Sequence, residues 1–266
     1  MSKGKEWALI LGASSGFGAA TAIELARSGM DVFGVHLDLR STIANAERVM
    51  AEVRAQGREA VFFNVNAADA EKRKSVVEAI EGRLAQEGPE AYVRCFLHSL
   101  AFGTLVPYVS ESPKGAVTER QMEMTLDVMA NSLVYWTQDL VARRLLRKGG
   151  RVFAMTSAGA TRVMKSYGPV SAAKAALESH IRQLALELAP LGITANAIRG
   201  GVTDTPSLRR IPGGTDYLAL AQQKNPSGRA TTPEDVARAI AALIDERLYW
   251  MTGNVIGVDG GEDVTG

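Results

Sequence analysis

Residues 7–27 read WALILGASSGFGAATAIELAR. The run 7–11 is wholly apolar, as in a parallel strand buried on both faces, and 19–27 places Ala, Ile and Leu at helical spacing. Glycines between the two permit a tight turn and let a phosphate approach the N–H groups at the positive end of the helix. Strand, G-x-x-x-G-x-G turn and helix in this order predict a dinucleotide-binding unit. The residues expected to bind the dinucleotide there are Gly12, Ser14, Ser15, Gly16, Phe17 and Gly18.

Apolar runs and amphipathic helices alternate along the rest of the chain. Strands are predicted at 7–11, 31–36, 59–65, 93–98, 151–156, 193–198 and 252–261. Helices are predicted at 19–27, 43–56, 70–86, 119–147, 170–188 and 232–245. The segment 119–147, one helix or two in succession, carries an apolar stripe that suits a core or a subunit interface. No linker or repeat interrupts this pattern. The sequence therefore predicts one α/β domain over 1–266, a Rossmann-like, doubly wound parallel sheet of about seven strands.

Composition limits the partners. The chain is 46% hydrophobic and 22% charged, and its net charge of +1 gives no overall attraction to nucleic acid or to an anionic membrane. No run approaches the roughly 18 to 20 apolar residues of a membrane span, and no signal peptide is expected, so we predict a cytoplasmic protein. Cys95 is the single cysteine and is expected to be a buried core residue rather than a reactive thiol. Without zinc-type spacing of Cys and His, no metal site is expected.

Polar residues after the second and third strands should face the adenosine end of the cofactor. Asp38 would bind ribose hydroxyls and repel a 2′-phosphate, whereas Arg40 would bind that phosphate. Both residues also suit an exposed loop. NADH and NADPH therefore both stay open, with NADPH slightly favoured. Asn64 would hydrogen-bond adenine or form a turn, with Val65 beside it.

Two later strand ends should complete the cofactor groove. His98 follows the fourth strand and is either a catalytic imidazole or, as we favour, a structural hydrogen-bonding residue. The other cofactor residues expected at these two ends are Ser99, Leu100, Gly201, Thr203 and Thr205. The stretch from about 205 to 229 is interrupted by Pro and Gly and shows neither clean helical nor clean strand periodicity, which predicts a mobile substrate lid.

Residues 157–174 read SAGATRVMKSYGPVSAAK and carry the expected chemistry. A phenol has a pKa near 10, so Tyr167 is a poor acid unless a cation or a hydrogen bond favours the phenolate. Lys174, near the start of the following helix, is the candidate cation. Ser157, at the carboxyl end of the fifth strand, would be a second donor or would orient Tyr167.

Together these motifs resemble those of the short-chain dehydrogenase/reductase superfamily over nearly the whole chain. They are the glycine turn at 12–18, the strand end at Ser157, Tyr167 with Lys174, Asn196 before a glycine-rich turn, and TGNVIGVDGG at 252–261. Most members separate the tyrosine and lysine by three residues, which would require a tyrosine where this chain has Val170. The six-residue separation resembles instead the divergent branch, the enoyl-acyl carrier protein reductases, as does HSLAF at 98–102.

Two positions refine the resemblance. Many members of this branch have a second tyrosine ten residues before the first, but here that position is Ser157, as in the subgroup typified by the third type of bacterial enoyl reductase. Most of the superfamily also carries an asparagine in the long central helix for a proton relay. Met129 occupies that place here, and the offset Asn131 is given no catalytic role. The missing relay favours enoyl over ketone reduction.

The resemblance implies hydride transfer from NADPH or NADH to the β carbon of a trans-2-enoyl thioester, as in fatty acid biosynthesis. Tyr167 would contact the thioester oxygen, with Phe102 beside the substrate. Arg209 and Arg210 in the lid would bind the phosphopantetheine or the acidic helix of acyl carrier protein, or would form a plain solvated pair. Coenzyme A esters are equally compatible as substrates. The apolar long helix suggests a homo-oligomer, a tetramer or a dimer.

Two other interpretations stay open. The first is an NAD(P)-dependent dehydrogenase of the same superfamily that acts on 3-ketoacyl, alcohol or steroid-type substrates. The second is a non-catalytic protein that binds the dinucleotide as a sensor.

Overall fold

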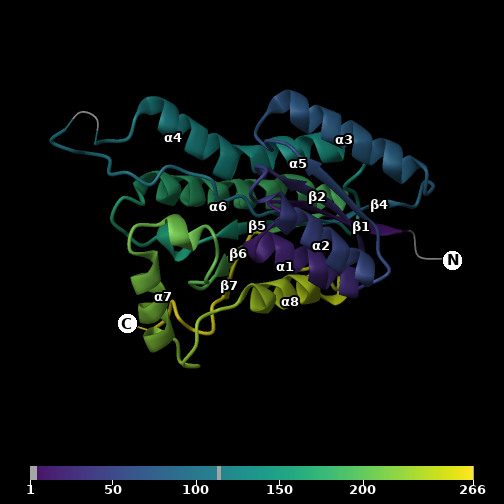
Figure 1. Ribbon diagram of the computed structural model, residues 1–266. Coiled ribbons are helices and arrows are strands. Elements are labelled where there is room, and N and C mark those ends of the chain that lie inside the picture. Colours follow the sequence, from purple (N-terminus) through teal and green to yellow (C-terminus); the bar gives the residue numbers. More distant parts are fainter. Residues whose placement is uncertain (1–4, 113–114, 266) are drawn as a thin grey trace.

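A seven-stranded parallel sheet forms the centre of the molecule, and the computed structural model describes residues 5–112 and 115–265 (Figure 1). The strands are β1 (Glu6–Leu11), β2 (Asp31–His36), β3 (Ala60–Asn64), β4 (Tyr92–His98), β5 (Arg151–Thr156), β6 (Thr194–Gly200) and β7 (Val255–Val258). Their order is β3-β2-β1-β4-β5-β6-β7, with every neighbouring pair parallel. The strand order reverses between β1 and β4, and open parallel sheets bind ligands beyond the carboxyl ends of the strands at that point. The predicted fold class is confirmed.

Helices cover both faces of the sheet. They are α1 (Gly16–Arg27), α2 (Ile43–Ala55), α3 (Ala70–Ala85), α4 (Glu119–Leu126), α5 (Ser132–Ala142), α6 (Gly168–Leu188), α7 (Gly214–Lys224) and α8 (Pro233–Leu243). Figure 1 shows α3, α5 and α6 on one face, and α1, α2 and α8 on the other. Short helical turns are η1 (Asp127–Asn131), η2 (Ala158–Ala160), η3 (Ala189–Leu191), η4 (Leu208–Arg210) and η5 (Glu246–Leu248).

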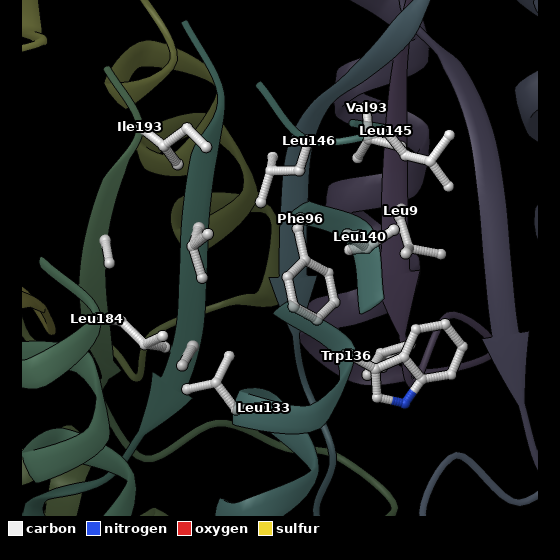
Figure 2. Close-up of a cluster of buried hydrophobic side chains, with 14 of the residues drawn as sticks. Leu9, Val93, Phe96, Leu133, Trp136, Leu140, Leu145, Leu146, Leu184 and Ile193 are labelled. Atoms are coloured by element: carbon white, nitrogen blue, oxygen red, sulfur yellow. The ribbon is translucent and has the colours of Figure 1, made fainter. Parts of the chain in front are cut away.

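Burial on both faces explains why the strands are continuous apolar runs. In β1, Trp7 and Leu9 point into the core under α3, α5 and α6, whereas Ala8 and Ile10 point into the core under α1, α2 and α8. Figure 2 shows the first of these cores. Cys95 lies in the second core with no exposed surface, and burial raises the pKa of its thiol to about 12. The thiol is therefore protonated and inert at neutral pH, as expected.

The predicted helix at 119–147 differs from the observed one in two ways. It consists of α4, the π-helical turn η1 and α5 without a break, and it ends at Ala142. The early end follows from Arg144, whose φ of 58° is left-handed and turns the N–H of Leu145 back to the carbonyl of Leu140. Leu140 and Trp136 of the apolar stripe are fully buried in the core of this same chain. The predicted dimer or tetramer stays a prediction.

The predicted lid contains regular structure that the sequence analysis missed. Helix α7 runs through its centre, and η4 precedes it. Gly213, one of the glycines that interrupt this stretch, has a φ of 76° and serves as the N-cap residue of α7. Only Gly214 and Ala221 of α7 are buried, so the helix lies largely on the surface.

Within the described residues, no helix combines the length and the apolar character needed to cross a membrane.

Candidate active site

The glycine turn after β1 is packed too tightly for side chains. An added Cβ at Gly18 would lie 2.1 Å from the carbonyl oxygen of Gly12, and one at Gly12 would lie 2.4 Å from the carbonyl oxygen of Ser99. Gly12 also has a φ of 87°, a conformation that favours glycine. The turn therefore packs against the end of β4, at the edge of the sheet where the strand order reverses.

The start of α1 is suited to an anion. Ser15 is its N-cap residue but makes no side-chain capping bond, and the first turn contains no acidic residue. Gly16, with a φ of 53°, lies opposite Thr205, and the ring of Phe17 packs on Gly200, so the loop after β6 borders this helix end. Unsatisfied N–H groups and the helix dipole favour a phosphate there.

Asp38, in the loop after β2, is surrounded by polar groups from β2, from this loop and from the glycine turn. Asp38 Oδ2 lies 2.8 Å from His36 Nδ1. Burial acts to raise the pKa of the Asp38 carboxyl, but hydrogen bonds from Thr42, Ser14 and His36 outweigh it and leave that pKa below its usual value. Because Ser14 belongs to the glycine turn, the ionised carboxylate lies beside the dinucleotide groove. Arg40 is exposed.

Asn64 bonds the backbone of Asp38, and its contact with adenine stays a prediction. Its Oδ1 accepts the Asp38 N–H at 2.9 Å, and its Nδ2 donates to the Asp38 carbonyl at 3.0 Å. Asn64 therefore fixes the backbone of Asp38. Val65 continues β3 and donates its N–H to the carbonyl of His36 at 2.8 Å.

His98, at the end of β4, is fully buried and neutral. Ser132 Oγ donates to the carbonyl of Val128 at 2.8 Å, so it accepts from His98 Nε2, which lies 2.8 Å away. Burial, and secondarily the charge of Lys174, lowers the pKa of His98 to about 3. An imidazole with this pKa does not shuttle protons at neutral pH, and its bond to Ser132 supports the structural alternative.

Lys174 is a buried cation held between two strand ends. Its Nζ donates to the carbonyl of Met155 at 2.8 Å and lies 3.3 Å from the carbonyl of Leu100. Burial lowers the pKa of Lys174 to about 8, while the charge of Glu178, one helical turn later, opposes that shift. Glu178 is in turn fixed by Thr156, whose Oγ1 donates to Glu178 Oε1 at 2.6 Å. The sequence analysis missed Glu178, although its position four residues after Lys174 was visible.

Tyr167 is the N-cap residue of α6 and is 8% exposed. Burial raises the pKa of its phenol, and a hydrogen bond with Ser157 opposes this effect. The Lys174 ammonium is directed to the carbonyls of Met155 and Leu100, and burial has the largest influence on the pKa of Tyr167. The effect of Lys174 on the phenol stays a prediction. The sequence analysis also missed Gly159, whose role is to leave room for the Tyr167 ring. An added Cβ there would lie 2.5 Å from the ring of Tyr167.

Met129 and Asn131 both lie in the π turn η1. Met129 packs in the apolar cluster that contains Tyr167, whereas Asn131 Oδ1 accepts from His180 Nε2 at 3.2 Å. An i→i+5 turn holds one residue more than an α turn, and such turns are frequent at functional sites.

The loop after β6 and the lid contain the remaining residues of the predicted site. Thr203 and Thr205 are buried, and Thr203 Oγ1 donates to the carbonyl of Gly201 at 2.9 Å. Arg209 makes a two-pronged ion pair with Asp204, with both N–O distances 2.9 Å. The described part of the chain gives Arg210 no ion-pair partner within 4.0 Å. Phe102, Ser99 and Leu100 occupy the segment after β4, with Phe102 54% exposed.

These residues fit a nicotinamide dinucleotide. The close-packed glycine turn and the uncapped positive end of α1 match a pyrophosphate, and Asp38 matches ribose hydroxyls. Lys174, Ser157 and Tyr167 lie beyond β4 and β5, where the nicotinamide end would be. Among the described residues, no group of three or more His, Cys, Asp and Glu side chains is arranged to hold a metal ion.

Comparison with known proteins agrees with this geometry. Residues 12–262 match the sequence model of a family described as enoyl-(acyl carrier protein) reductase. The 1-cyclohexenylcarbonyl-CoA reductase of Streptomyces collinus is 30% identical over 265 residues, which cover 97% of this chain and 86% of that protein.

Solved structures show the same fold. A short-chain dehydrogenase from Burkholderia cenocepacia, in complex with NADP, superposes with a TM-score of 0.79 at 26% identity and 98% coverage of both chains. The enoyl-[acyl-carrier-protein] reductase (NADH) from Aquifex aeolicus gives a TM-score of 0.81 at 24% identity, with 99% of this chain and 98% of that one covered. A nicotinamide-dependent oxidoreductase site is thus supported by the strand ends, the buried Tyr167 and Lys174, and the family match over most of the chain. The chain belongs to the short-chain dehydrogenase/reductase family, in the group that resembles the enoyl-acyl carrier protein reductases.

Proposed function

We propose that this protein reduces the α,β double bond of a 2-enoyl thioester. The observation that carries the proposal is the environment of Tyr167. Ser157 opposes the rise that burial causes in the pKa of the Tyr167 phenol, and the Tyr167 ring packs in an apolar cluster bordered by Leu105, Met164 and Ile211 from three loops. A single phenol donor within an apolar wall suits an acyl chain whose one polar reacting group is a thioester carbonyl.

The chain's own residues would stabilise the charge that reduction creates. The nicotinamide cofactor supplies a hydride to the β carbon when bound, and negative charge then develops on the thioester oxygen. Tyr167 donates its O–H to that oxygen, since its raised pKa keeps the phenol protonated at neutral pH. Ser157 orients the hydroxyl, and the Lys174 cation holds the ribose and favours negative charge nearby. Burial of the two residues strengthens both effects because water screens them less.

Two observations favour an enoyl over a ketone substrate. The Streptomyces collinus relative is named for a substrate, 1-cyclohexenylcarbonyl-CoA, that is itself a conjugated enoyl thioester. In addition, the proton-relay asparagine expected for a ketone reductase is replaced in the Tyr167 cluster by Met129. Fatty acid synthesis and coenzyme A ester reduction use the same chemistry at this site.

The deciding experiment is a matrix of cofactors and substrates followed by cofactor absorbance. NADH and NADPH are each combined with crotonyl, longer enoyl and acetoacetyl thioesters. Turnover of the enoyl series well above acetoacetyl supports the proposal. The reverse order establishes the ketone reductase, and cofactor binding without turnover on the whole panel establishes the sensor.

We further propose that NADH is the preferred cofactor, against the preference for NADPH taken from the sequence. Asp38 is held ionised beside the glycine turn, where a 2′-phosphate would meet like charge. We expect kcat/KM to be at least about tenfold higher with NADH, and Asp38→Asn to reduce that ratio mainly by improving NADPH. Arg40→Gln is the companion variant. If Arg40→Gln lowers kcat/KM with NADPH while Asp38→Asn leaves kcat/KM with both cofactors unchanged, Arg40 sets the preference instead.

The lid arginines allow a test of carrier-protein binding. We propose that Arg210 contacts the acidic surface of acyl carrier protein, since Arg209 is already paired with Asp204. Arg210→Glu should raise KM about threefold to tenfold for an enoyl-carrier-protein substrate and little for the coenzyme A ester. Arg209→Glu is the matched control and should have the smaller effect. Equal effects on the two substrates would contradict the proposal.

A further inference from the structure

We infer that the C-terminal segment 259–265 positions the catalytic segment 157–167, with Asp263 as the positioning residue. This inference rests on the proposed function only in taking Tyr167 as the donor. No part of the predicted site lies in this segment, and none of its residues has been given a role. Its contacts reach three of the elements that form the active site.

Asp263 joins the catalytic segment to the sheet. Asp263 Oδ1 lies 2.9 Å from Arg162 Nη2, and the Asp263 carbonyl accepts from that same nitrogen at 2.5 Å. Asp263 Oδ2 lies 2.9 Å from Arg199 Nη1, at the end of β6. The Asp263 side chain is only 16% exposed, so water screens these ion pairs less than it screens pairs on the open surface.

Arg162 lies at the middle of the connection between Ser157 and Tyr167, in which Met164 packs against the apolar cluster of Tyr167. After η2 the chain has no regular structure until α6, and Val163 is fully exposed. Ser166, directly before Tyr167, has a φ of 60°, which is uncommon for a residue other than glycine. A loop with this little apolar packing depends on polar contacts for its position.

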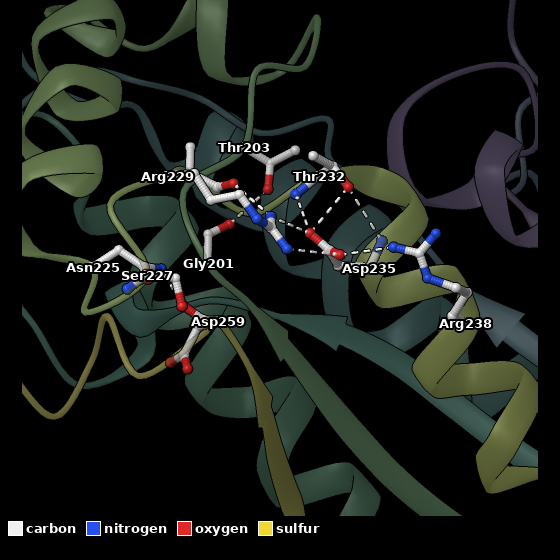
Figure 3. A network of polar contacts seen from close by, with 10 residues as sticks. Gly201, Thr203, Asn225, Ser227, Arg229, Thr232, Asp235, Arg238 and Asp259 are labelled. Carbon is white, nitrogen blue, oxygen red and sulfur yellow. Dashed lines mark hydrogen bonds and ion pairs between the residues drawn. The ribbon is translucent and has the colours of Figure 1, made fainter.

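The neighbouring residues of the segment hold the other side of the site. Glu262 Oε2 accepts the N–H of Val202 at 3.0 Å, in the loop after β6 that borders the glycine turn. At the lid, Asn225 Nδ2 donates to the Asp259 carbonyl at 2.7 Å (Figure 3). Thr265 Oγ1 donates to the Lys224 carbonyl at 2.9 Å. The catalytic segment, the loop after β6 and the end of the lid helix α7 are thus all fastened to residues 259–265.

The test compares the Asp263→Asn variant with the unmodified protein. Asn keeps the shape and the backbone carbonyl that accepts from Arg162, but removes the charge that pairs with Arg162 and Arg199. We expect kcat to fall about 10- to 10²-fold, because small displacements of a catalytic group have effects of this size, while the Kd for the cofactor stays within about twofold. Asp263→Glu should recover part of the loss. Asp245→Asn removes an exposed ion pair of similar length, with Arg247 at 2.7 Å and outside the active site, and should leave kcat unchanged.

Amide hydrogen exchange separates positioning from general stability and needs no substrate. In Asp263→Asn we expect faster exchange in 158–166, with β1, β4 and β5 unchanged. Arg162→Met should act similarly, and the double variant should be no worse than either single one. Unchanged exchange in 158–166, or faster exchange throughout the sheet, would overturn the inference. If neither enoyl nor keto thioesters are turned over, the proposed function fails and this exchange pattern still decides the inference.

Discussion

Replacing Tyr167 with phenylalanine is expected to lower turnover of an enoyl thioester by about 10²- to 10⁴-fold, the usual contribution of a general acid. The phenylalanine ring would keep the packing against Gly159 and the apolar cluster, so the fold and the Kd for the cofactor should not change. Steady-state kinetics with a crotonyl thioester and cofactor binding by fluorescence measure the two quantities.

Tyr108→Phe is the matched control. The Tyr108 ring packs over Gly168, next to Tyr167, yet half of its surface is exposed. Removing this hydroxyl should leave turnover within about threefold of wild type. If Tyr167→Phe also stays near wild type, the phenol is not the donor and the proposed mechanism is wrong.

The second large effect concerns Lys174. Lys174→Met should lower kcat/KM by about 10²-fold or more, since it removes both the ribose contact and the positive charge. In the unmodified protein, the pKa of about 8 means that Lys174 is charged below that pH and loses its charge as the pH rises through it. We therefore expect kcat/KM to decline on the alkaline side with a midpoint near pH 8.

Glu178→Gln tests whether Lys174 causes this alkaline decline in kcat/KM. Glu178 raises the pKa of Lys174, so its removal should move the alkaline midpoint to lower pH. Glu187→Gln lies on the same helix, where Glu187 bonds Gln183, and should leave the midpoint in place. A midpoint that is the same in all three proteins would show that another group controls the limb.

The fold could be predicted because the determining signals are local. Strands buried on both faces are continuous apolar runs, and the runs at 31–36 and 151–156 coincide with β2 and β5. The glycine turn and Ser157 follow directly on β1 and β5, at the strand ends that the sequence predicted. The π turn η1 was not predictable, since DVMAN contains neither Gly nor Pro to mark a change in the helix.

The contacts that tune the site could not be predicted because they join distant segments. Asn64 bonds Asp38 across 26 positions, and Arg162 bonds Asp263 across 101. Lys174 was predicted as the cation, but its pairing with two strand-end carbonyls depends on how β4 and β5 are placed side by side. Periodicity reports which face of an element is buried, and says little about which polar groups meet at its ends.

The π turn in the long helix affects which side chains of that helix face Tyr167, and so whether this wall of the active site is apolar or polar. Each residue of an α-helix rotates the following side chains by about 100°, so one residue more or less before Ser132 would turn a different side chain toward Tyr167. Here that phase sets the sulfur of Met129 in the wall and leaves the amide of Asn131 with His180. Inserting or deleting one residue in this helix before Ser132 could thus convert an apolar wall into a polar one without altering Ser157, Tyr167 or Lys174.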